Sequence, residues 1–564
     1  MKPQIKILLI LLYFAKDTNI YIDRLNYFGW SLSGIIYIFF FLLLLFSVLI
    51  VAHIKNNYIR LIVGLIFFIC VVSFDSYQRI MLEEFDYNAY INMIDAAGSF
   101  GEAFQQYGKL YLISAGYGLL LLLGMVLKPK RWIFNKFYLY SIPVLSFLLF
   151  TYLIFFKGGS GALGLPSIYT PLSYSSLMLY ELSQDEFGIR EDITIKRQDA
   201  AIGHDIIYIL DESVVANYLD INNKNGVNTS LGLPYSNIEI FNYGYAASIA
   251  NCSKATNITL RYGGTREDYK KIIYSKPSMW RYAQNAGLKT IYIDAQRSKG
   301  ELQNGMTKRE LSHVDQFIQF DDVTILNRDQ ETAKLLIDLI NNDTSEFIFV
   351  NKVGLHFPIH DKYPDAFLKY TPALPRGTWG NISDTGSRKG FNGTDEDWAE
   401  YRNSYRNTLE WNVGEFFSKI LNNANLNKAL IIYTSDHGQD LHERKNPGNN
   451  THCSATPTIE EGLVPLVVIQ GNSLNTLNWS KTLNDNKDKS SHFNIFPTLL
   501  KVMKYDSTAI SNVYGNSLDV PTKDDFTFNK FWNARLGKDP SWKKINIKNM
   551  VSPPPSDFSS PTEK

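Results

Sequence analysis

Long hydrophobic runs without internal charges dominate the first 156 residues of the chain. Four of these runs lie at 31–52, 59–74 (with Arg60 at its edge), 110–127 and 138–156. Each approaches the roughly 20 residues that a helix needs to cross a bilayer. A fifth run, 5–15, is shorter and also suits the core of a signal peptide, but no small-residue cleavage site follows it. We therefore predict a transmembrane helical anchor over residues 1–157 with five spans, and four spans as the alternative.

The charges between these runs predict how the anchor is oriented. Two connections are basic, through His53, Lys55 and Arg60 and through Lys128, Lys130, Arg131 and Lys136. The connection 75–109 is rich in Asp and Glu. Basic connections remain in the cytoplasm. The alternation of sides then places everything after Phe156 outside the cytoplasm.

Beyond residue 157 the pattern is that of a soluble globular protein. Short β-rich runs, apolar on both faces, lie at 205–210, 289–294, 346–351, 429–435 and 464–470. Segments with helical spacing separate them, at 278–287, 331–342 and 405–424. This alternation predicts an α/β domain with a largely parallel central sheet. We assign 158–200 to a linker that could carry an interfacial helix, 201–520 to the α/β domain, and 521–564 to a C-terminal extension with a disordered end.

Composition narrows the possible functions. The chain has 56 Lys and Arg against 55 Asp and Glu, so its charge does not indicate nucleic-acid binding. Its three cysteines, Cys70, Cys252 and Cys453, allow at most one disulfide and form no Cys-x-x-Cys motif. This excludes a cysteine-type zinc or redox site.

Metal-binding residue types follow the predicted strands. "DES" (211–213) comes after the first strand, "VGLHFPIH" (353–360) after the third and "DHGQDLHE" (436–443) after the fourth. Ligands of such sheets bind beyond the carboxyl ends of the strands. Glu212, Asp436 and His437 offer the oxygen and nitrogen atoms that hold Zn²⁺ or Mn²⁺. Each alone would also suit an ordinary turn or helix cap, and it is their joint placement that indicates a metal site.

A hydroxyl-rich stretch could work with such a metal. "CSKATNITLR" (252–261) contains Ser253, Thr256 and Thr259 and no acidic residue. Alone, this composition is common in polar loops. Beside a divalent cation, one hydroxyl would lose its proton more easily and become a nucleophile.

Several segments together resemble a known family. "ILDES", "CSKATNIT", "VGLHFPIHDKYP", "TSDHGQDL" and "SHFNIFPTLL" occur in the order found in membrane-anchored phosphoethanolamine transferases of the alkaline phosphatase and sulfatase superfamily. The resemblance covers the five-span anchor and most of 205–505. It implies an alkaline-phosphatase-like fold for the α/β domain. It also implies a metal-dependent enzyme of the bacterial inner membrane whose catalytic domain is periplasmic.

The resemblance also assigns roles to individual residues. Thr256 matches the nucleophile and a metal ligand, with Ser248 as its rival, and Ser253 and Thr259 are neighbours that shape the loop. Glu212, Asp436 and His437 match the other ligands, with Zn²⁺ favoured and Mn²⁺ as the alternative. His356 and His452 match histidines that bind phosphate or assist the oxygens, and Lys299 and Gln296 match substrate-binding residues. The family's usual cysteine partner is replaced by Tyr262, so the family's disulfide framework is absent. Cys252 and Cys453 could bond to each other, since each lies near a predicted site residue.

The predicted reaction has two steps. Thr256 takes phosphoethanolamine from phosphatidylethanolamine, a lipid of the bilayer, and passes it to lipopolysaccharide or another envelope glycan. The alternatives are phosphoglycerol transfer from phosphatidylglycerol and a sulfatase-like hydrolysis. A fourth possibility is an inactive binding module on a membrane anchor. Neither the acceptor nor the oligomeric state follows from the sequence.

Overall fold

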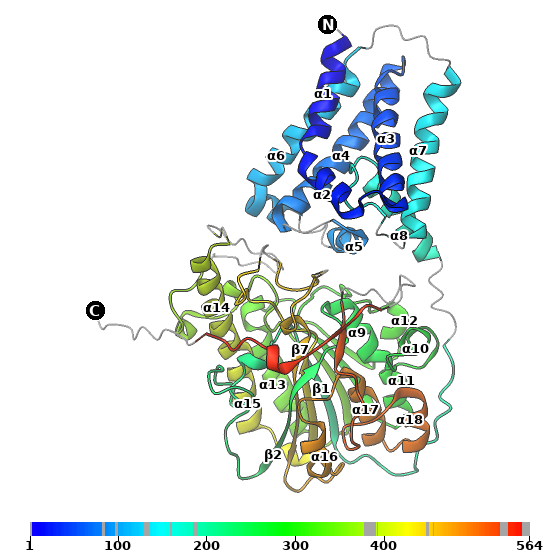
Figure 1. The fold of residues 1–564 in the computed structure, drawn as a ribbon. Helices are drawn as coiled ribbons and strands as arrows, with labels where there is room; N and C mark the ends of the chain where they lie inside the picture. The colour runs from blue at the N-terminus through cyan, green and yellow to red at the C-terminus, as the bar shows by residue number, and fades with distance from the viewer. Residues whose placement is uncertain are drawn as a thin grey trace, which may run out of the picture. The chain divides into compact units, whose positions relative to one another are not determined.

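The computed structural model describes residues 3–81, 85–95, 100–128, 136–157, 159, 161–183, 190–376, 391, 393–446, 450–454, 456–530 and 540–554. Figure 1 shows its helices and strands. The chain divides near residue 185 into two compact units, which we call the helical unit and the α/β unit.

The helical unit contains the predicted membrane anchor. Its helices are α1 (Pro3–Ala15), α2 (Thr18–Phe28), α3 (Leu32–Ala52), α4 (Asn57–Met81), α5 (Tyr87–Asp95), α6 (Phe100–Val126), α7 (Lys136–Phe156) and α8 (Thr170–Ser183). Within the described residues, parts of α3, α4 and α6 are long and apolar enough to cross a membrane, and α1 and α7 contain shorter apolar segments. All five predicted runs are therefore helical, while five spans stays a prediction. Helix α8 lies in the segment that we expected to be a linker, and it buries Tyr174 in the helical unit.

Basic side chains cap the helix ends at one end of this unit. Lys6 Nζ donates hydrogen bonds to the carbonyls of Met125 and Leu127, 2.8 and 2.7 Å away, at the end of α6. Arg60 donates to the carbonyl of Ile54, just beyond α3. The last carbonyls of a helix have no partner within it and carry partial negative charge, so cations are stabilising there.

A seven-stranded sheet forms the centre of the α/β unit. Its strands are β1 (Asp205–Asp211), β2 (Ile238–Ala247), β3 (Lys289–Asp294), β4 (Gln316–Ile318), β5 (Glu346–Asn351), β6 (Ala429–Ser435) and β7 (Leu463–Gly471). The order is β2-β7-β6-β1-β5-β3-β4. Strands β6, β1, β5, β3 and β4 pair in parallel, whereas β7 is antiparallel to both of its neighbours. The predicted largely parallel sheet is confirmed.

The five predicted strands are all present in this sheet, and two of its strands, β2 and β4, were missed. Strand β2 contains a register shift between Asn242 and Tyr245, which breaks the alternation of its side chains. Gly244 makes this bend possible, because its φ of 74° is one that other residues rarely adopt. Strand β4 is only three residues long and lies at the edge of the sheet.

Helices cover both faces of the sheet (Figure 1). One core contains alternate β1 residues such as Tyr208 and packs under α9 (Ser253–Tyr262), α10 (Tyr269–Ser275), α11 (Met279–Asn285), α16 (Trp479–Asn486), α17 (Ile495–Val502) and α18 (Ser507–Tyr514). The other contains Ile207 and Ile209 and packs under α13 (Arg328–Asn341), α14 (Asp395–Leu409) and α15 (Phe416–Asn423). Helix α12 (Lys308–Leu311) is a single turn. Because both faces are covered, polar groups of the sheet collect at the ends of its strands.

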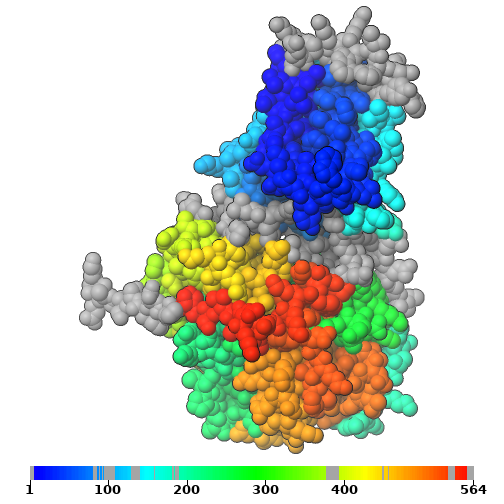
Figure 2. Space-filling view, viewed as in Figure 1, coloured from blue at the N-terminus to red at the C-terminus, as the bar shows by residue number. Residues whose placement is uncertain are grey.

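The C-terminal extension folds onto the α/β unit. Strands β8 (Thr527–Asn529) and β9 (Trp542–Lys544) form a two-stranded sheet. The following residues lie across one face of the unit, in red in Figure 2. They are held by hydrogen bonds from Asn217 to the Val551 carbonyl and from Arg406 to the Pro554 carbonyl. The predicted disordered end, 555–564, lies outside the described residues.

Candidate metal centre and active site

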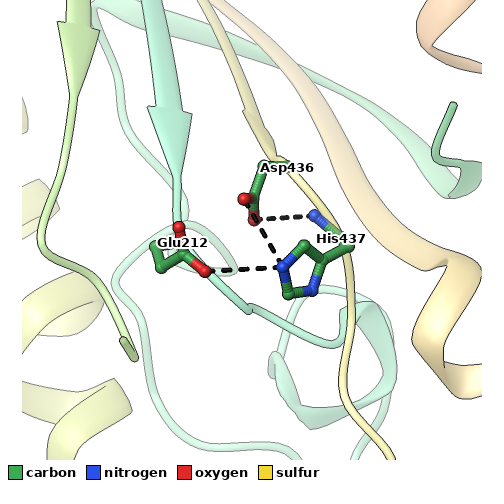
Figure 3. A group of neighbouring side chains, drawn as sticks. All are labelled: Glu212, Asp436 and His437. Atoms are coloured by element: carbon green, nitrogen blue, oxygen red, sulfur yellow. Dashed lines mark hydrogen bonds and ion pairs between the residues drawn. The ribbon is translucent and has the colours of Figure 1, made fainter. Parts of the chain in front are cut away.

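Two neighbouring strands bring the predicted metal ligands together. Strands β1 and β6 pair in parallel with Asp211 opposite Ser435, so the next residues, Glu212 and Asp436, emerge side by side. With His437 they form the only group of three His, Cys, Asp or Glu residues in the described part of the chain that could hold a metal ion. Their ligand atoms lie within 4.8 Å of one another. Figure 3 shows the two carboxylates pointing toward the His437 ring.

The His437 ring is oriented as a metal ligand. Its Nδ1 lies 2.7 Å from the Gly438 carbonyl, which can only accept, so Nδ1 carries the proton. The unprotonated Nε2 then faces Glu212 Oε1 and Asp436 Oδ2, each 3.5 Å away. A lone pair directed at two carboxylates is repelled unless a cation lies between them. A histidine that binds a metal through one ring nitrogen characteristically donates a hydrogen bond from the N–H of the other, often to a backbone carbonyl.

Burial leaves these carboxylates in need of a cation. Glu212 and Asp436 are 3% and 1% exposed. Burial, reinforced by the neighbouring Asp436 charge, raises the pKa of Glu212 to about 7, and burial raises the pKa of Asp436 to about 6. Asp436 Oδ1 accepts hydrogen bonds from the backbone of Ser213 and His437, but Oδ2 has no hydrogen-bond partner among the described residues. An unpaired buried carboxylate oxygen is costly, and the site fits a divalent cation.

The hydroxyl of Ser253 lies against two of these ligands, whereas the buried Ser213 hydroxyl donates to Glu212 Oε1 alone, over 2.9 Å. Ser253 Oγ lies 3.1 Å from His437 Nε2 and 3.4 Å from Glu212 Oε1. Ser253 is the first residue of α9, directly after the N-cap Cys252, and it is half-buried. The first N–H groups of a helix have no partner within it, and the helix dipole favours negative charge there. Ser253 therefore stands where an anionic group could bind.

The hydroxyl of the predicted nucleophile, Thr256, is hydrogen-bonded to Ala250, and none of the three ligands is among its hydrogen-bond partners in the described part of the chain. Thr256 Oγ1 exchanges hydrogen bonds with the carbonyl and the N–H of Ala250, both at 3.3 Å, and the side chain is fully buried. Thr256 lies one turn further along α9, and side chains on a helix tilt toward its N-terminus. That tilt directs the hydroxyl back to the preceding loop. The rival Ser248 is also buried and donates to the Ala250 carbonyl, 2.9 Å away.

His452 lies beside His437, and its position is fixed by bonds that the next residue makes to the segment before α9. The two rings stack with centroids 4.6 Å apart. Next to it, Cys453 forms a disulfide with Cys252, and its N–H donates to the Asn251 carbonyl over 2.8 Å. The bond thus joins the residue before Ser253 to the residue after His452. Cys70 is the free cysteine.

We expect loss of this disulfide to destabilise the α/β unit. The bond closes a loop with a sequence separation of 201 residues, which constrains the unfolded chain. Removing it in Cys252→Ala/Cys453→Ala should cost about 2–4 kcal/mol. Thermal unfolding in detergent would measure the change, with Cys70→Ala as the matched control. Equal melting temperatures for the double variant and the wild type would contradict this expectation.

The other predicted site residues divide into two groups. Gln296 is buried, and its Nε2 lies 3.2 Å from Glu212 Oε2. His356 is half-buried, and a positive charge on its ring would partly offset the rise in the Glu212 pKa that burial causes. Lys299, in contrast, is exposed in a left-handed turn (φ 56°) whose N–H donates to Asp321. The structure does not place Lys299 against the metal ligands, and its contact with substrate stays a prediction.

Two contributors were missed by sequence reasoning. Ser253 was treated as a residue that shapes the loop, although its position directly after the N-cap of a helix following a strand could have identified it. Lys352 follows β5 and is fully buried, with its Nζ 2.7 Å from Asp211 Oδ2. The sequence signal was a charge at the end of the apolar run "FIFVNKVG".

Comparisons with known proteins agree with this architecture. The family model described as Sulfatase matches residues 204–505. The Kdo(2)-lipid A phosphoethanolamine 7''-transferase of Escherichia coli (strain K12) is 27% identical over 128 residues, which are 23% of this chain and 20% of that protein. The enzyme of the same name from Salmonella typhimurium is 26% identical over 140 residues, which are 24% of this chain and 22% of that protein. The matches thus span only about a fifth of the length of these curated relatives.

A solved structure extends the comparison to the helical unit. The integral membrane protein lipooligosaccharide phosphoethanolamine transferase A from Neisseria meningitidis superposes with a TM-score of 0.61 at 16% identity. The superposition covers 90% of this chain and 98% of that chain. The two proteins therefore share a fold over most of this chain, N-terminal helices included.

Proposed function

This chain belongs to the sulfatase family, and we propose that it is a membrane-anchored, metal-dependent phosphoethanolamine transferase. The observation that carries the proposal is the Ser253 hydroxyl, 3.1 Å from His437 Nε2 at the N-terminus of α9. The curated relatives named above support this chemistry, as does the shared fold of the helical unit.

We assign the nucleophile to Ser253 in place of Thr256. In the first step Ser253 Oγ attacks the phosphorus of phosphatidylethanolamine. A P–O bond to Oγ forms, the P–O bond to diacylglycerol breaks, and the serine proton ends on the departing diacylglycerol oxygen. In the second step an acceptor hydroxyl attacks the same phosphorus, and its proton returns to Ser253. Splitting one difficult displacement into two easier ones is the advantage of covalent catalysis.

Glu212, Asp436 and His437 would hold the metal, for which zinc fits the mixed oxygen and nitrogen donors and manganese is the alternative. When bound, the divalent cation would supply charge that lowers the pKa of a nearby hydroxyl and stabilises phosphoryl oxygens. The open N-terminus of α9 would orient the phosphoryl group from the other side.

The remaining site residues handle protons and substrate. We assign His452, stacked on His437, to the transfer of a proton at the departing or entering oxygen. His356 would neutralise developing charge near Glu212, and Gln296 would hold that carboxylate by its hydrogen bond. Thr256 keeps the loop before α9 in place through Ala250. Lys299 would meet the substrate phosphate from its exposed turn.

The helical unit supports a membrane lipid as the proposed donor. We propose five spans in the bacterial inner membrane and a periplasmic α/β unit. A donor that is itself a bilayer lipid then needs no soluble carrier. Among envelope glycans, lipopolysaccharide is the proposed acceptor, because the curated relatives are named for transfer to Kdo(2)-lipid A.

Intact-mass analysis of the full-length protein tests the donor. After incubation with zinc and phosphatidylethanolamine, and without acceptor, we expect a mass gain equal to one phosphoethanolamine. Phosphatidylglycerol in parallel should give none. A phosphoglycerol adduct would favour the phosphoglycerol transferase instead. Steady release of free phosphoethanolamine would indicate a hydrolase. The absence of both an adduct and released phosphoethanolamine would contradict the proposed enzymatic activity.

A further inference from the structure

A fully buried lysine lies behind the metal-ligand carboxylates. Lys352 Nζ donates to Asp211 Oδ2 at 2.7 Å and to the Asn412 carbonyl at 2.6 Å, and it lies 3.7 Å from Asp329 Oδ2. The side chains of Lys352 and Asp211 are both 0% exposed. Burying an ion is unfavourable unless the ion is well paired. The hydrogen bonds and carboxylates around the Lys352 ammonium must therefore offset the cost of burying it. No step of the proposed reaction uses it.

Asp211 links this lysine to both carboxylate ligands. Its Oδ1 accepts the N–H of Glu212 over 3.1 Å. Its own carbonyl accepts the N–H of Asp436 over 2.9 Å. Tyr433 adds a second donor to Asp211 Oδ2, 3.1 Å away. The orientation of Asp211 therefore sets the backbone from which Glu212 and Asp436 project.

The backbone around Lys352 approaches Glu212 by a second route. Gln296 Nε2 donates to the Lys352 carbonyl over 2.7 Å and to Glu212 Oε2 over 3.2 Å. Gly354 follows with a φ of 53°, and a Cβ there would lie 2.2 Å from Asp211 Oδ1 and 2.7 Å from the Glu212 nitrogen. Only glycine permits this approach. The segment 352–354 is thus packed directly on the backbone of the metal centre.

The remaining hydrogen-bond partner of Lys352 lies in a π-helix, which is a rare helix type. Asn412 lies in the π-helix Glu410–Glu415, between α14 and α15. Its carbonyl accepts the Lys352 ammonium, and its Nδ2 donates to the Gly354 carbonyl over 2.6 Å. Asp329, from α13, binds the N–H groups of Val353 and Gly354. Single-turn π-helices are uncommon and occur frequently at functional sites.

We propose that Lys352 is a positioning residue of the metal centre. Its ammonium fixes Asp211, and Asp211 fixes the main chain of Glu212 and Asp436 so that their side chains converge on the cation. The inference rests on the proposed metal site. The Lys352 ammonium places a positive charge next to carboxylates that would otherwise repel one another.

Zinc affinity of the full-length protein in detergent tests this role. Metal would be removed with a chelator and zinc titrated back in competition with a chromophoric chelator. Lys352→Met should weaken zinc binding about 10–100-fold, the usual cost of losing a group that orients a ligand. The matched control is Lys334→Met, an exposed lysine paired with Glu331 on α13. It should bind zinc as the wild type does.

A second variant separates positioning from folding. Lys352→Met leaves Asp211 and Asp329 without their counterion, which can unfold the protein. Lys352→Met/Asp329→Asn restores the net buried charge, although the amide can accept only one of the two N–H groups that Asp329 binds. We therefore expect a metal-free melting temperature above that of Lys352→Met and still weakened zinc binding. A folded variant that binds zinc with wild-type affinity overturns the inference. Failure of the wild type itself to bind zinc contradicts the proposed metal site instead.

Discussion

Ser253→Ala should abolish the phosphoethanolamine adduct and lower kcat by roughly 10⁴-fold or more, as loss of a catalytic nucleophile does in other enzymes. The substitution removes the one hydroxyl among the described residues that lies within hydrogen-bond distance of both His437 Nε2 and Glu212. Glu212, Asp436 and His437 remain in place, so zinc stoichiometry should be unchanged. Intact mass after incubation with phosphatidylethanolamine, together with metal content, measures both expectations.

Thr256→Ala is the matched control on the same helix. It removes hydrogen bonds to Ala250, so it should loosen the loop before α9 and reduce the rate while the adduct still forms. Ser253→Thr, which keeps a hydroxyl, should retain part of the adduct. An adduct that persists in Ser253→Ala and disappears in Thr256→Ala would return the nucleophile to Thr256.

The contrast between Ser253 and Thr256 shows how far the sequence alone can lead. The motif around Cys252 pointed to α9, whose first residue lies beside the three ligands, because its order relative to "DES" and "DHG" is informative. It could not fix the register within the helix. Which hydroxyl faces the ligands depends on where α9 begins, and the N-cap at Cys252 places Ser253 at the first position.

The convergence of Glu212, Asp436 and His437 was predictable because it depends on strand ends. Apolar runs identified β1 and β6, and polar residues after them identified Glu212, Asp436 and His437. The pairing of Asp211 with Ser435, which brings the ligands side by side, is a register that no local pattern specifies. The same holds for Lys352, since its partner Asp211 is 141 residues away in the sequence.

Lys299 shows what a motif match leaves open, which is the direction of the side chain. The charge stands close to the end of β3, as the family pattern expects. Its left-handed turn and the bond from its N–H to Asp321 leave the side chain exposed. Side-chain direction after a strand is set by such turns, and a charge pattern does not encode it.

Asp436→Asn should remove the metal while leaving the fold intact. The amide keeps the shape of the side chain, and its oxygen can still accept the N–H groups of Ser213 and His437. It eliminates the negative charge of Oδ2, the oxygen that has no hydrogen-bond partner in the described part of the chain. Since losing an orienting group costs 10–100-fold in metal affinity, loss of a direct ligand should cost more than about 100-fold. Metal analysis and transferase rate should fall together.

Stability measurements distinguish this result from simple damage. In the metal-free protein Glu212 and Asp436 are buried like charges, so Asp436→Asn should melt at the same or a higher temperature than metal-free wild type. Zinc at about 100 times its Kd should stabilise the wild type by about 2.7 kcal/mol and leave the variant unchanged. A variant that melts well below metal-free wild type would indicate that Asp436 supports the fold. If neither zinc nor a chelator changes the melting temperature of the wild type, there is no metal at this site.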